Sequence, residues 1–236
     1  MIDRLKRFLK KFPPFYAFLI NLFGPVFITG TSHQYLFQHL QKDSKILNVG
    51  SGPTKLRKGI INLDVYPYTT VDIVGNAHGL PIQNESCDGV ISLVLLEHTR
   101  QPVVCIQEMF RILKIGGLAY CRLPFVVPYH SAPQDYYRWT KDGIKELFRD
   151  FHILKIGVAG GPTSSCLWVF QEWIAMLFSF NIKFIYELLY ILLMVLTFPL
   201  KFLDVFLSKY MFASNLASTF YVIARKENGS FFIKTR

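Results

Sequence analysis

Closely spaced cysteines are absent from this sequence. Its four cysteines, Cys87, Cys105, Cys121 and Cys166, each stand alone, and no Cys-x-x-Cys pair occurs. Because zinc sites and disulfide scaffolds rely on such spacing, we predict no metal site and no disulfide framework. Isolated cysteines fit a reducing, cytosolic compartment. Internal repeats and low-complexity tracts are absent as well, so the 236 residues predict one domain with additions.

Complete phosphate-binding fingerprints are also missing. The hydrophobic run at 46–49 leads into Gly50-Ser51-Gly52, but Lys55 stands in the place of a third glycine, and no Gly-Lys-Ser/Thr motif occurs. The ligand expected at this turn is therefore a nucleoside without a pyrophosphate. Asp64 ends the next hydrophobic run, where a carboxylate can accept hydrogen bonds from both hydroxyls of a ribose. An ordinary strand-to-helix turn is the alternative interpretation of the glycines.

What the chain does have is an alternation of apolar strands and amphipathic helices. Alternation of this kind predicts an α/β fold: a Rossmann-like, seven-stranded, mostly parallel sheet with helices on both faces. Ligands in such folds bind beyond the carboxyl ends of the strands. We expect helices near 103–114, after Pro102, and from Thr140 to about Phe148. The predicted strands lie near 46–50, 60–64, 71–75, 88–93, 117–123, 152–158 and 218–225.

Several motifs, in this order, resemble class I S-adenosylmethionine-dependent methyltransferases of the methyltransferase type 11 group. The resemblance covers roughly residues 45–158 and a final strand near 218–225. It rests on Asn48-Val49-Gly50-Ser51-Gly52, Asp64, Asn76-Ala77-His78-Gly79-Leu80-Pro81, Cys87-Asp88-Gly89-Val90-Ile91, Leu96-Glu97-His98, Glu108-Met109-Phe110-Arg111-Ile112-Leu113-Lys114 and Gly116-Gly117. It implies an enzyme that uses S-adenosyl-L-methionine as its cofactor.

The resemblance also implies roles for individual residues. Asp64 would hold the ribose, while Asn76 and Ala77 would border the adenine. The cofactor-binding residues expected by matching position are Gly50, Ser51, Gly52, Asp64, Asn76, Ala77 and His78. Two positions depart from the family pattern, because Asn48 and Asn76 stand where that family usually has Asp. Loss of the carboxylate at Asn48 would weaken the hold on the methionine amine.

A second group of polar residues is expected to face the acceptor. His98 follows the fourth predicted strand, and an imidazole there can serve as a base at neutral pH or hydrogen-bond a loop carbonyl. The proline-stiffened segment 124–140 contains His130, Asp135 and Arg138. A similar run marks a subgroup of bacterial methyltransferases associated with cell-surface glycans, so the resemblance implies an acceptor site. In the alternative, Asp135 and Arg138 pair only to brace the loop.

The remaining segments are apolar or basic. The apolar and basic residues of 1–12 predict a cationic amphipathic helix, typical of segments on an anionic membrane surface. A solvated helix packed on its own domain is the alternative. Residues 166–182 and 183–211 predict two apolar helices before the last strand. Their longest charge-free run, 188–200, is shorter than the roughly 20 residues of a membrane span. The insertion must also return to the sheet, so we expect a hairpin in the membrane interface; a dry cap or dimer interface is the alternative.

These observations predict an N-terminal helical segment at 1–40, a methyltransferase domain at 41–160 and an apolar helical insertion at 161–213. The last strand at 214–226 and a tail at 227–236 follow. The predicted function is methylation of a lipid-linked, glycan or amphipathic small-molecule acceptor. The enzyme would be cytoplasmic, held peripherally at the inner face of an anionic membrane.

Two other functions fit parts of the sequence. A catalytically silent membrane scaffold with the cofactor fold is supported only by Asn48 and Asn76. An RNA methyltransferase is supported by the net charge of +10. We do not expect nucleic acid as a partner, because the basic residues cluster at the termini and beside apolar segments rather than along a groove with aromatics.

Overall fold

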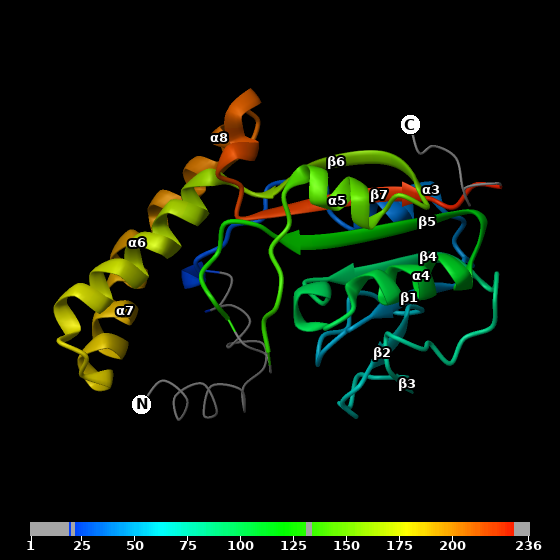
Figure 1. Cartoon of the computed structure of the whole chain (residues 1–236), viewed down its shortest axis with the longest axis horizontal. Helices are drawn as coiled ribbons and strands as arrows, with labels where there is room; N and C mark the ends of the chain where they lie inside the picture. Colours follow the sequence, from blue (N-terminus) through cyan, green and yellow to red (C-terminus); the bar gives the residue numbers. More distant parts are fainter. Residues whose placement is uncertain (1–18, 20–21, 131–133, 229–236) are drawn as a thin grey trace. The chain divides into compact units, whose positions relative to one another are not determined.

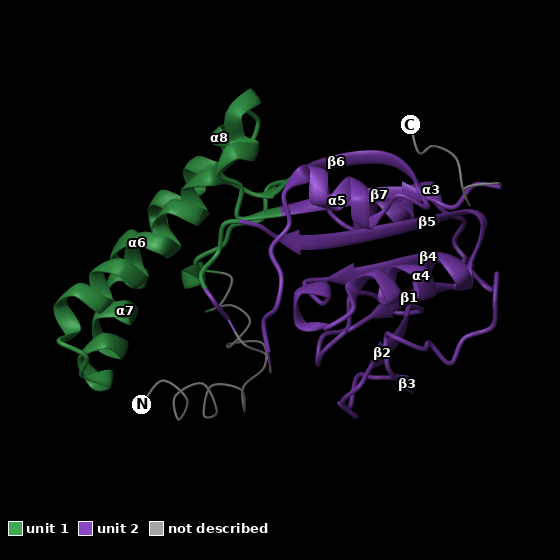
Figure 2. Cartoon of the chain, in the orientation of Figure 1, with its two compact units in different colours: residues 1–30, 126–128, 158–219 green, residues 31–125, 129–157, 220–236 purple. Residues whose placement is uncertain are grey.

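The computed structural model describes residues 19, 22–130 and 134–228. The chain divides into two compact units (Figure 2). Unit 1 comprises residues 1–30, 126–128 and 158–219, and unit 2 comprises residues 31–125, 129–157 and 220–236. The predicted basic helix at 1–12 and most of the predicted tail lie outside the described residues.

The seven predicted strands form one sheet in the order β3-β2-β1-β4-β5-β7-β6 (Figure 1). Parallel pairs join β1 to β2, β1 to β4, β2 to β3 and β4 to β5. The start of β5 pairs with the end of β7, because Gly116 N–H donates to the Lys226 carbonyl at 2.7 Å and Lys226 N–H donates to the Gly117 carbonyl at 3.0 Å. β7 is therefore antiparallel to β5, and the predicted Rossmann-like fold is confirmed. The strands are β1 (Ile46–Val49), β2 (Ile61–Asp64), β3 (Ile73–Val74), β4 (Cys87–Leu93), β5 (Leu113–Pro124), β6 (His152–Gly160) and β7 (Thr219–Arg225).

The helices of unit 2 begin where their sequences carry start signals. α4 (Pro102–Ile112) has proline at its first position, where the missing N–H removes no helical hydrogen bond. α5 (Lys141–Leu147) is capped by the Thr140 hydroxyl, which accepts a hydrogen bond from Gly143 N–H at 3.1 Å. Both helices were predicted. Two short elements complete the unit, α3 (Gln34–His39) and the 3₁₀ turn η1 (Leu96–His98).

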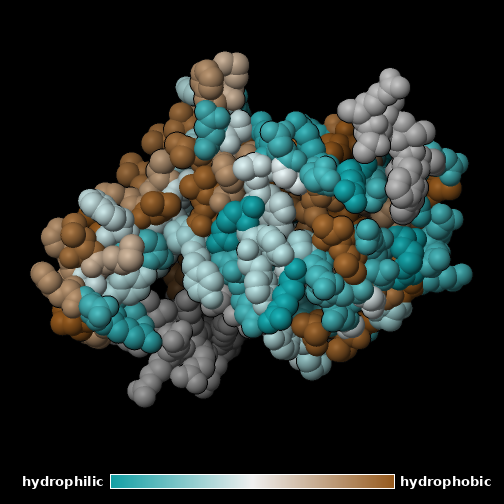
Figure 3. All heavy atoms as spheres, in the orientation of Figure 1, coloured by the Kyte–Doolittle hydropathy of each residue, from teal (hydrophilic) through white to brown (hydrophobic). Residues whose placement is uncertain are grey.

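Several polar side chains of the apolar insertion in unit 1 are buried. The Lys201 ammonium is buried and donates to the Gly24 carbonyl at 2.8 Å, and the amide of Gln171 donates to the Thr197 hydroxyl at 2.7 Å. Large apolar side chains are exposed instead, and brown atoms accordingly cover much of this unit (Figure 3). The elements are α6 (Pro162–Ser179), α7 (Lys183–Thr197), η2 (Phe198–Leu203), α8 (Asp204–Leu207) and η3 (Met211–Asn215).

The prediction that no apolar stretch of this insertion is long enough for a membrane span is wrong. The helical stretch Lys183–Leu207 has 25 residues and contains an 18-residue window with a mean hydropathy of 2.0. By length and composition alone it could cross a membrane. The predicted charge-free run 188–200 begins after Glu187 and ends before Lys201. The side chains of Lys201 and Asp204 are both buried, so neither places a charge on the exposed surface of the stretch.

Candidate active site

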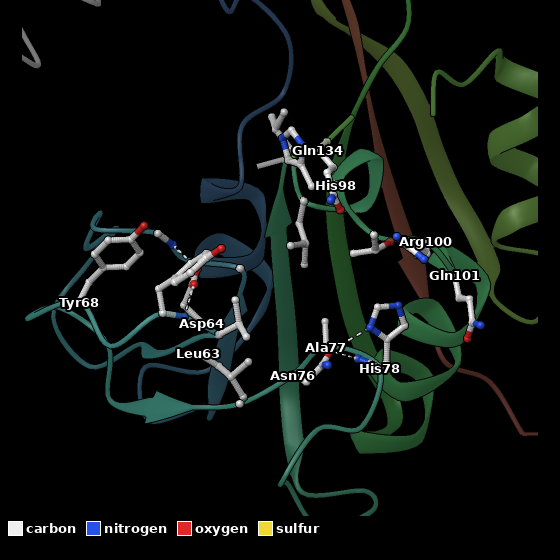
Figure 4. A pocket seen from close by; sticks show the side chains of 18 of the residues that line it. Leu63, Asp64, Tyr68, Asn76, Ala77, His78, His98, Arg100, Gln101 and Gln134 are labelled. Atoms are coloured by element: carbon white, nitrogen blue, oxygen red, sulfur yellow. Dashed lines mark hydrogen bonds between the residues drawn. The ribbon is translucent and has the colours of Figure 1, made fainter. Parts of the chain in front are cut away.

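A cavity of about 700 Å³ lies beyond the carboxyl ends of β1, β2 and β4 (Figure 4). Most of the predicted cofactor residues line it: Gly50, Gly52, Asp64, Asn76, Ala77 and His78. Ser51 does not line it, since its hydroxyl turns back to the Gly52 carbonyl at 3.2 Å. Of the predicted acceptor residues, His98 lines the cavity, whereas His130, Asp135 and Arg138 lie outside its wall.

Glycine is required at the turn after β1. Gly50 has a φ of +70°, and a Cβ there would lie 2.6 Å from a Leu95 methyl group. Gly50 and Ser51 N–H groups both donate to the Leu63 carbonyl, at 2.8 and 3.1 Å, which joins the turn to the end of β2. The backbone therefore bends sharply, and at Gly50 no side chain separates it from the cavity.

Asp64, at the end of β2, is buried and its carboxylate spans two turns. One oxygen accepts Gly52 N–H at 2.8 Å, and the other accepts Tyr66 N–H at 2.9 Å. A carboxylate oxygen has a second lone pair, so the group can still accept hydroxyl donors from a ligand. Asp64 therefore shapes the glycine turn and presents an acceptor to the cavity at the same time.

Asn76 and His78 form a local pair at the cavity wall. The Asn76 side-chain carbonyl accepts the His78 backbone N–H at 3.0 Å and lies 2.8 Å from the His78 Nδ1 (Figure 4). The remaining hydrogen-bonding group on Asn76 is its amide N–H₂, the group predicted to meet an adenine.

Asn48, the departure noted in the sequence, is buried in the sheet and does not line the cavity. Its amide donates to the Asn62 side-chain oxygen at 3.1 Å, and the Asn62 amide donates in turn to the Thr70 carbonyl at 2.9 Å. One amide hydrogen bond thus joins the two adjacent strands, and the Asn48 side-chain oxygen has no hydrogen-bond partner among the described residues. An aspartate at 48 would face the oxygen of Asn62.

His98 is oriented by the loop that follows β5. Its Nδ1 donates to the Gln134 carbonyl at 2.5 Å, so the loop-carbonyl interpretation of this residue is confirmed. That bond places the proton on Nδ1 and leaves Nε2 with a free lone pair in the neutral ring. Nε2 lies 3.8 Å from the buried Glu97 carboxylate.

The predicted acceptor loop is braced by an ion pair. Arg138 donates to both oxygens of Asp135, from Nη1 to Oδ1 at 2.5 Å and from Nη2 to Oδ2 at 2.6 Å. Asp135 Oδ2 also accepts the His130 N–H at 2.9 Å. Burial opposes ionisation of Asp135, but these hydrogen bonds outweigh it and hold its pKa at about 2. The expected pair of Asp135 and Arg138 is thus present, while a role toward the acceptor stays a prediction.

Sequence reasoning missed several residues of the cavity wall. Tyr66 and Tyr68 follow Asp64 and stand exposed at the rim, with ring centroids 6.0 Å apart. Arg100 donates to the Tyr136 hydroxyl at 3.0 Å, and Gln134 and Tyr136 line the wall beside it. The aromatic residues directly after Asp64 were a usable signal; the placement of Arg100 and Gln134 depends on tertiary packing.

Comparison with known proteins agrees with this geometry. Residues 34–121 match the family model described as a methyltransferase domain. The match covers less than half of the chain, and the structure has the Rossmann-like sheet that a class I S-adenosylmethionine-dependent methyltransferase implies. The resemblance in the sequence is thereby confirmed, including enzyme class and cofactor. A search of curated proteins finds no significant match to this sequence.

Solved structures share the fold of this methyltransferase at low identity. A candidate sarcosine dimethylglycine methyltransferase from Galdieria sulphuraria is 15% identical, with a TM-score of 0.53 over 83% of this chain and 85% of its own. A candidate methyltransferase from Bacillus halodurans is 14% identical, with a TM-score of 0.52 over 84% and 100%. The [4+2]-cyclase SpnF is 17% identical, with a TM-score of 0.51 over 81% and 77%. These likenesses show the fold alone.

The residues of the methyltransferase domain fit the cofactor's chemistry. S-adenosylmethionine supplies an activated methyl group, so the protein has mainly to position two partners and exclude water. The bare backbone at Gly50–Gly52 permits close approach, and Asp64 offers oxygen acceptors suited to ribose hydroxyls.

Proposed function

We propose that this methyltransferase works at the cytoplasmic face of a membrane on a lipid-linked, glycan or amphipathic small-molecule acceptor. The observation that carries the proposal is that unit 1 exposes many large apolar side chains and buries several charged ones. Helices of water-soluble proteins bury apolar side chains and expose polar ones. In unit 1, Leu196 and Phe206 are each 65% exposed, whereas Asp204 is 0% and Lys201 1% exposed. Such a surface is stable where its surroundings are apolar.

Peripheral attachment fits the chain connections better than a crossing. The helices α6 to α8 leave β6 and return to β7, and these strands are neighbours in one sheet. A single crossing would put the two strands on opposite sides of the bilayer. The basic residues predicted to lie on a helix at 1–12 would add attraction to anionic lipids, about 1 kcal/mol for each charge near the surface.

The acceptor is proposed to bind beside His98 and the loop that follows β5. This loop connects the cavity wall, through Gln134 and Tyr136, to the braced set of His130, Asp135 and Arg138. Polar groups fixed by an ion pair are suited to holding a hydroxylated or charged head group. His130→Ala and Arg138→Gln should therefore lower turnover more than cofactor affinity.

The membrane proposal is tested by vesicle flotation of the full chain. Binding should survive high salt and require detergent for extraction. Protease added to one side of sealed vesicles should find no segment protected on the other side. Recovery of the whole chain in the soluble fraction at low salt would defeat the proposal. Protection of a fragment around 183–207 would replace it with a spanning helix.

The enzymatic proposal is tested by mass spectrometry of lipids and glycans extracted from cells with and without the chain. A product heavier by one methyl group is expected in its presence. Calorimetry with S-adenosylhomocysteine separates the rival functions, because a silent scaffold would release no heat. A salt-dependent shift of RNA mobility together with absent vesicle binding would favour RNA as the acceptor.

A further inference from the structure

The Glu97 carboxylate has an unusual environment in unit 2. Its side chain is 0% exposed, and neither oxygen has a hydrogen-bond partner among the described residues. An unpaired buried charge is costly, and native structures normally satisfy such a group with a donor, a water or an ion. The buried oxygens of Glu97 therefore call for a partner, either a hydrogen-bond donor or a cation.

Two histidines point the same kind of atom at this carboxylate. The Nε2 atoms of His98 and His130 each lie 3.8 Å from the same oxygen of Glu97. A separation of 3.8 Å is beyond hydrogen-bond range. Two ligand atoms that share one metal ion at about 2.1 Å each lie about 3–4 Å apart. The ligand atoms of all three residues fall within 4.8 Å of one another.

The Nδ1 atoms of His98 and His130, which would not bind the metal, lie near groups that typically hold a metal-binding histidine. His98 Nδ1 donates to the Gln134 carbonyl, which leaves Nε2 as the lone-pair nitrogen. His130 Nδ1 lies 3.5 Å from an Asp135 oxygen and 3.4 Å from an Arg138 nitrogen. The guanidinium can only donate, so Nδ1 accepts in that contact. A metal ion at Nε2 requires His130 to carry its proton on Nδ1 instead, directed at Asp135. Histidine ligands of metals are typically held by a carbonyl or a carboxylate in this way.

We propose that Glu97, His98 and His130 bind one divalent transition-metal ion, such as Zn²⁺, at the acceptor side of the cavity. Two imidazoles and a carboxylate favour Zn²⁺ or Fe²⁺ over Mg²⁺ or Ca²⁺, which prefer oxygen ligands. The histidine side chains are 14% and 27% exposed, so the ion keeps open positions toward solvent. Because His98 lines the cavity, those positions can take an oxygen of the acceptor. Only this last role rests on the proposed function.

One other cation competes for Glu97. Burial lowers the pKa of the Arg122 guanidinium, and the nearby Tyr120 and Glu97 act in the opposite direction. If Arg122 alone neutralised Glu97, the histidines would contribute nothing to metal binding. The test therefore depends on the histidines.

The experiment titrates chelator-treated full-length protein with Zn²⁺ by calorimetry and with Co²⁺ by visible absorption. The wild type should bind one Zn²⁺ per chain. Glu97→Gln and His130→Ala should each weaken binding by more than the roughly 10–100-fold expected for loss of an outer partner. Asp135→Asn removes such a partner and should fall within that range. His152→Ala, at an exposed histidine, is the matched control and should bind like the wild type.

Three outcomes would overturn the proposal: no Zn²⁺ or Co²⁺ binding by the wild type, equal binding by His130→Ala, or preference for Mg²⁺. If Glu97→Gln fails to fold, the partly exposed His130 still decides the question. Binding of S-adenosylhomocysteine to His130→Ala should stay within about twofold of the wild type. A wild type that binds Zn²⁺ but no S-adenosylhomocysteine would refute the methyltransferase function and leave the metal site standing.

Discussion

The carboxylate of Asp204 caps the first turn of α6 through Ser164, although 40 positions separate them in the sequence. One Asp204 oxygen accepts the Ser164 N–H at 2.9 Å and its hydroxyl at 2.6 Å, and the other accepts Thr163 N–H at 2.8 Å. The negative charge lies at the positive end of the helix dipole, and it satisfies N–H groups that no helical carbonyl can reach. This contact explains why an acidic residue sits inside the apolar insertion.

Asp204→Ala should therefore destabilise unit 1. Removing three hydrogen bonds from a fully buried site should cost about 2–4 kcal/mol of unfolding free energy. Thermal unfolding in mild detergent measures the loss. Asp142→Ala removes an exposed carboxylate from the first turn of α5 and should change stability by less than about 0.5 kcal/mol. Equal effects of the two substitutions would contradict the capping role.

Asp64→Asn should weaken binding of S-adenosylhomocysteine by about 2–4 kcal/mol, the scale of lost charge-assisted hydrogen bonds to two ribose hydroxyls. The asparagine is preferable to alanine because Asp64 also accepts Gly52 and Tyr66 N–H groups, which alanine would leave unpaired. Calorimetry measures the affinity, with the exposed Asp43→Asn as control. Unchanged affinity in a folded Asp64→Asn protein would remove this residue from the cofactor site.

Glu108 should make stability depend on pH. Hydrogen bonds from Arg111 lower the pKa of Glu108 below its ordinary value of 4.5, and Leu80 N–H, at 2.7 Å, acts in the same direction. The stabilisation is fully present above pH 4.5 and is lost as the pH falls through the lowered folded-state pKa. Glu108→Gln should cost about 1–2 kcal/mol at pH 7 and progressively less below that window.

Urea unfolding of the wild type and Glu108→Gln between pH 7 and pH 3.5 checks this. The exposed Glu146→Gln serves as the control. A Glu108→Gln difference that stays constant over the whole range would show that the pair contributes by packing rather than by charge.

Substitutions on the exposed face of unit 1 should weaken vesicle binding without unfolding the protein. Leu196→Gln and Phe206→Gln each remove a side chain that would contribute about 1–3 kcal/mol on leaving water. Flotation affinity should fall at least about tenfold for the double variant. Val74→Gln, at a position 59% exposed in β3, should have no effect. If the double variant and Val74→Gln bind vesicles as tightly as the wild type, the membrane contact lies elsewhere.

The sequence by itself determined the local features of this protein. Strands and helices followed from hydrophobic periodicity, and the Thr140 cap and the Pro102 start lay where local signals put them. The Gly50 turn and Asp64 were also readable, because a positive φ and a strand-end acceptor depend on neighbouring residues. Short-range sterics and hydrogen bonding suffice for such features.

Only the tertiary structure decided which distant side chains meet. Lys201 ended the apolar run 188–200 of the sequence, and only folding gives its ammonium a buried partner at Gly24 and gives Asp204 one at Ser164. Glu97 and His130 lie far apart in the sequence, and only the return of the loop after β5 brings them to 3.8 Å. Whether a polar residue is exposed, capped or ligating depends on packing between elements, and periodicity along one element carries no information about that packing.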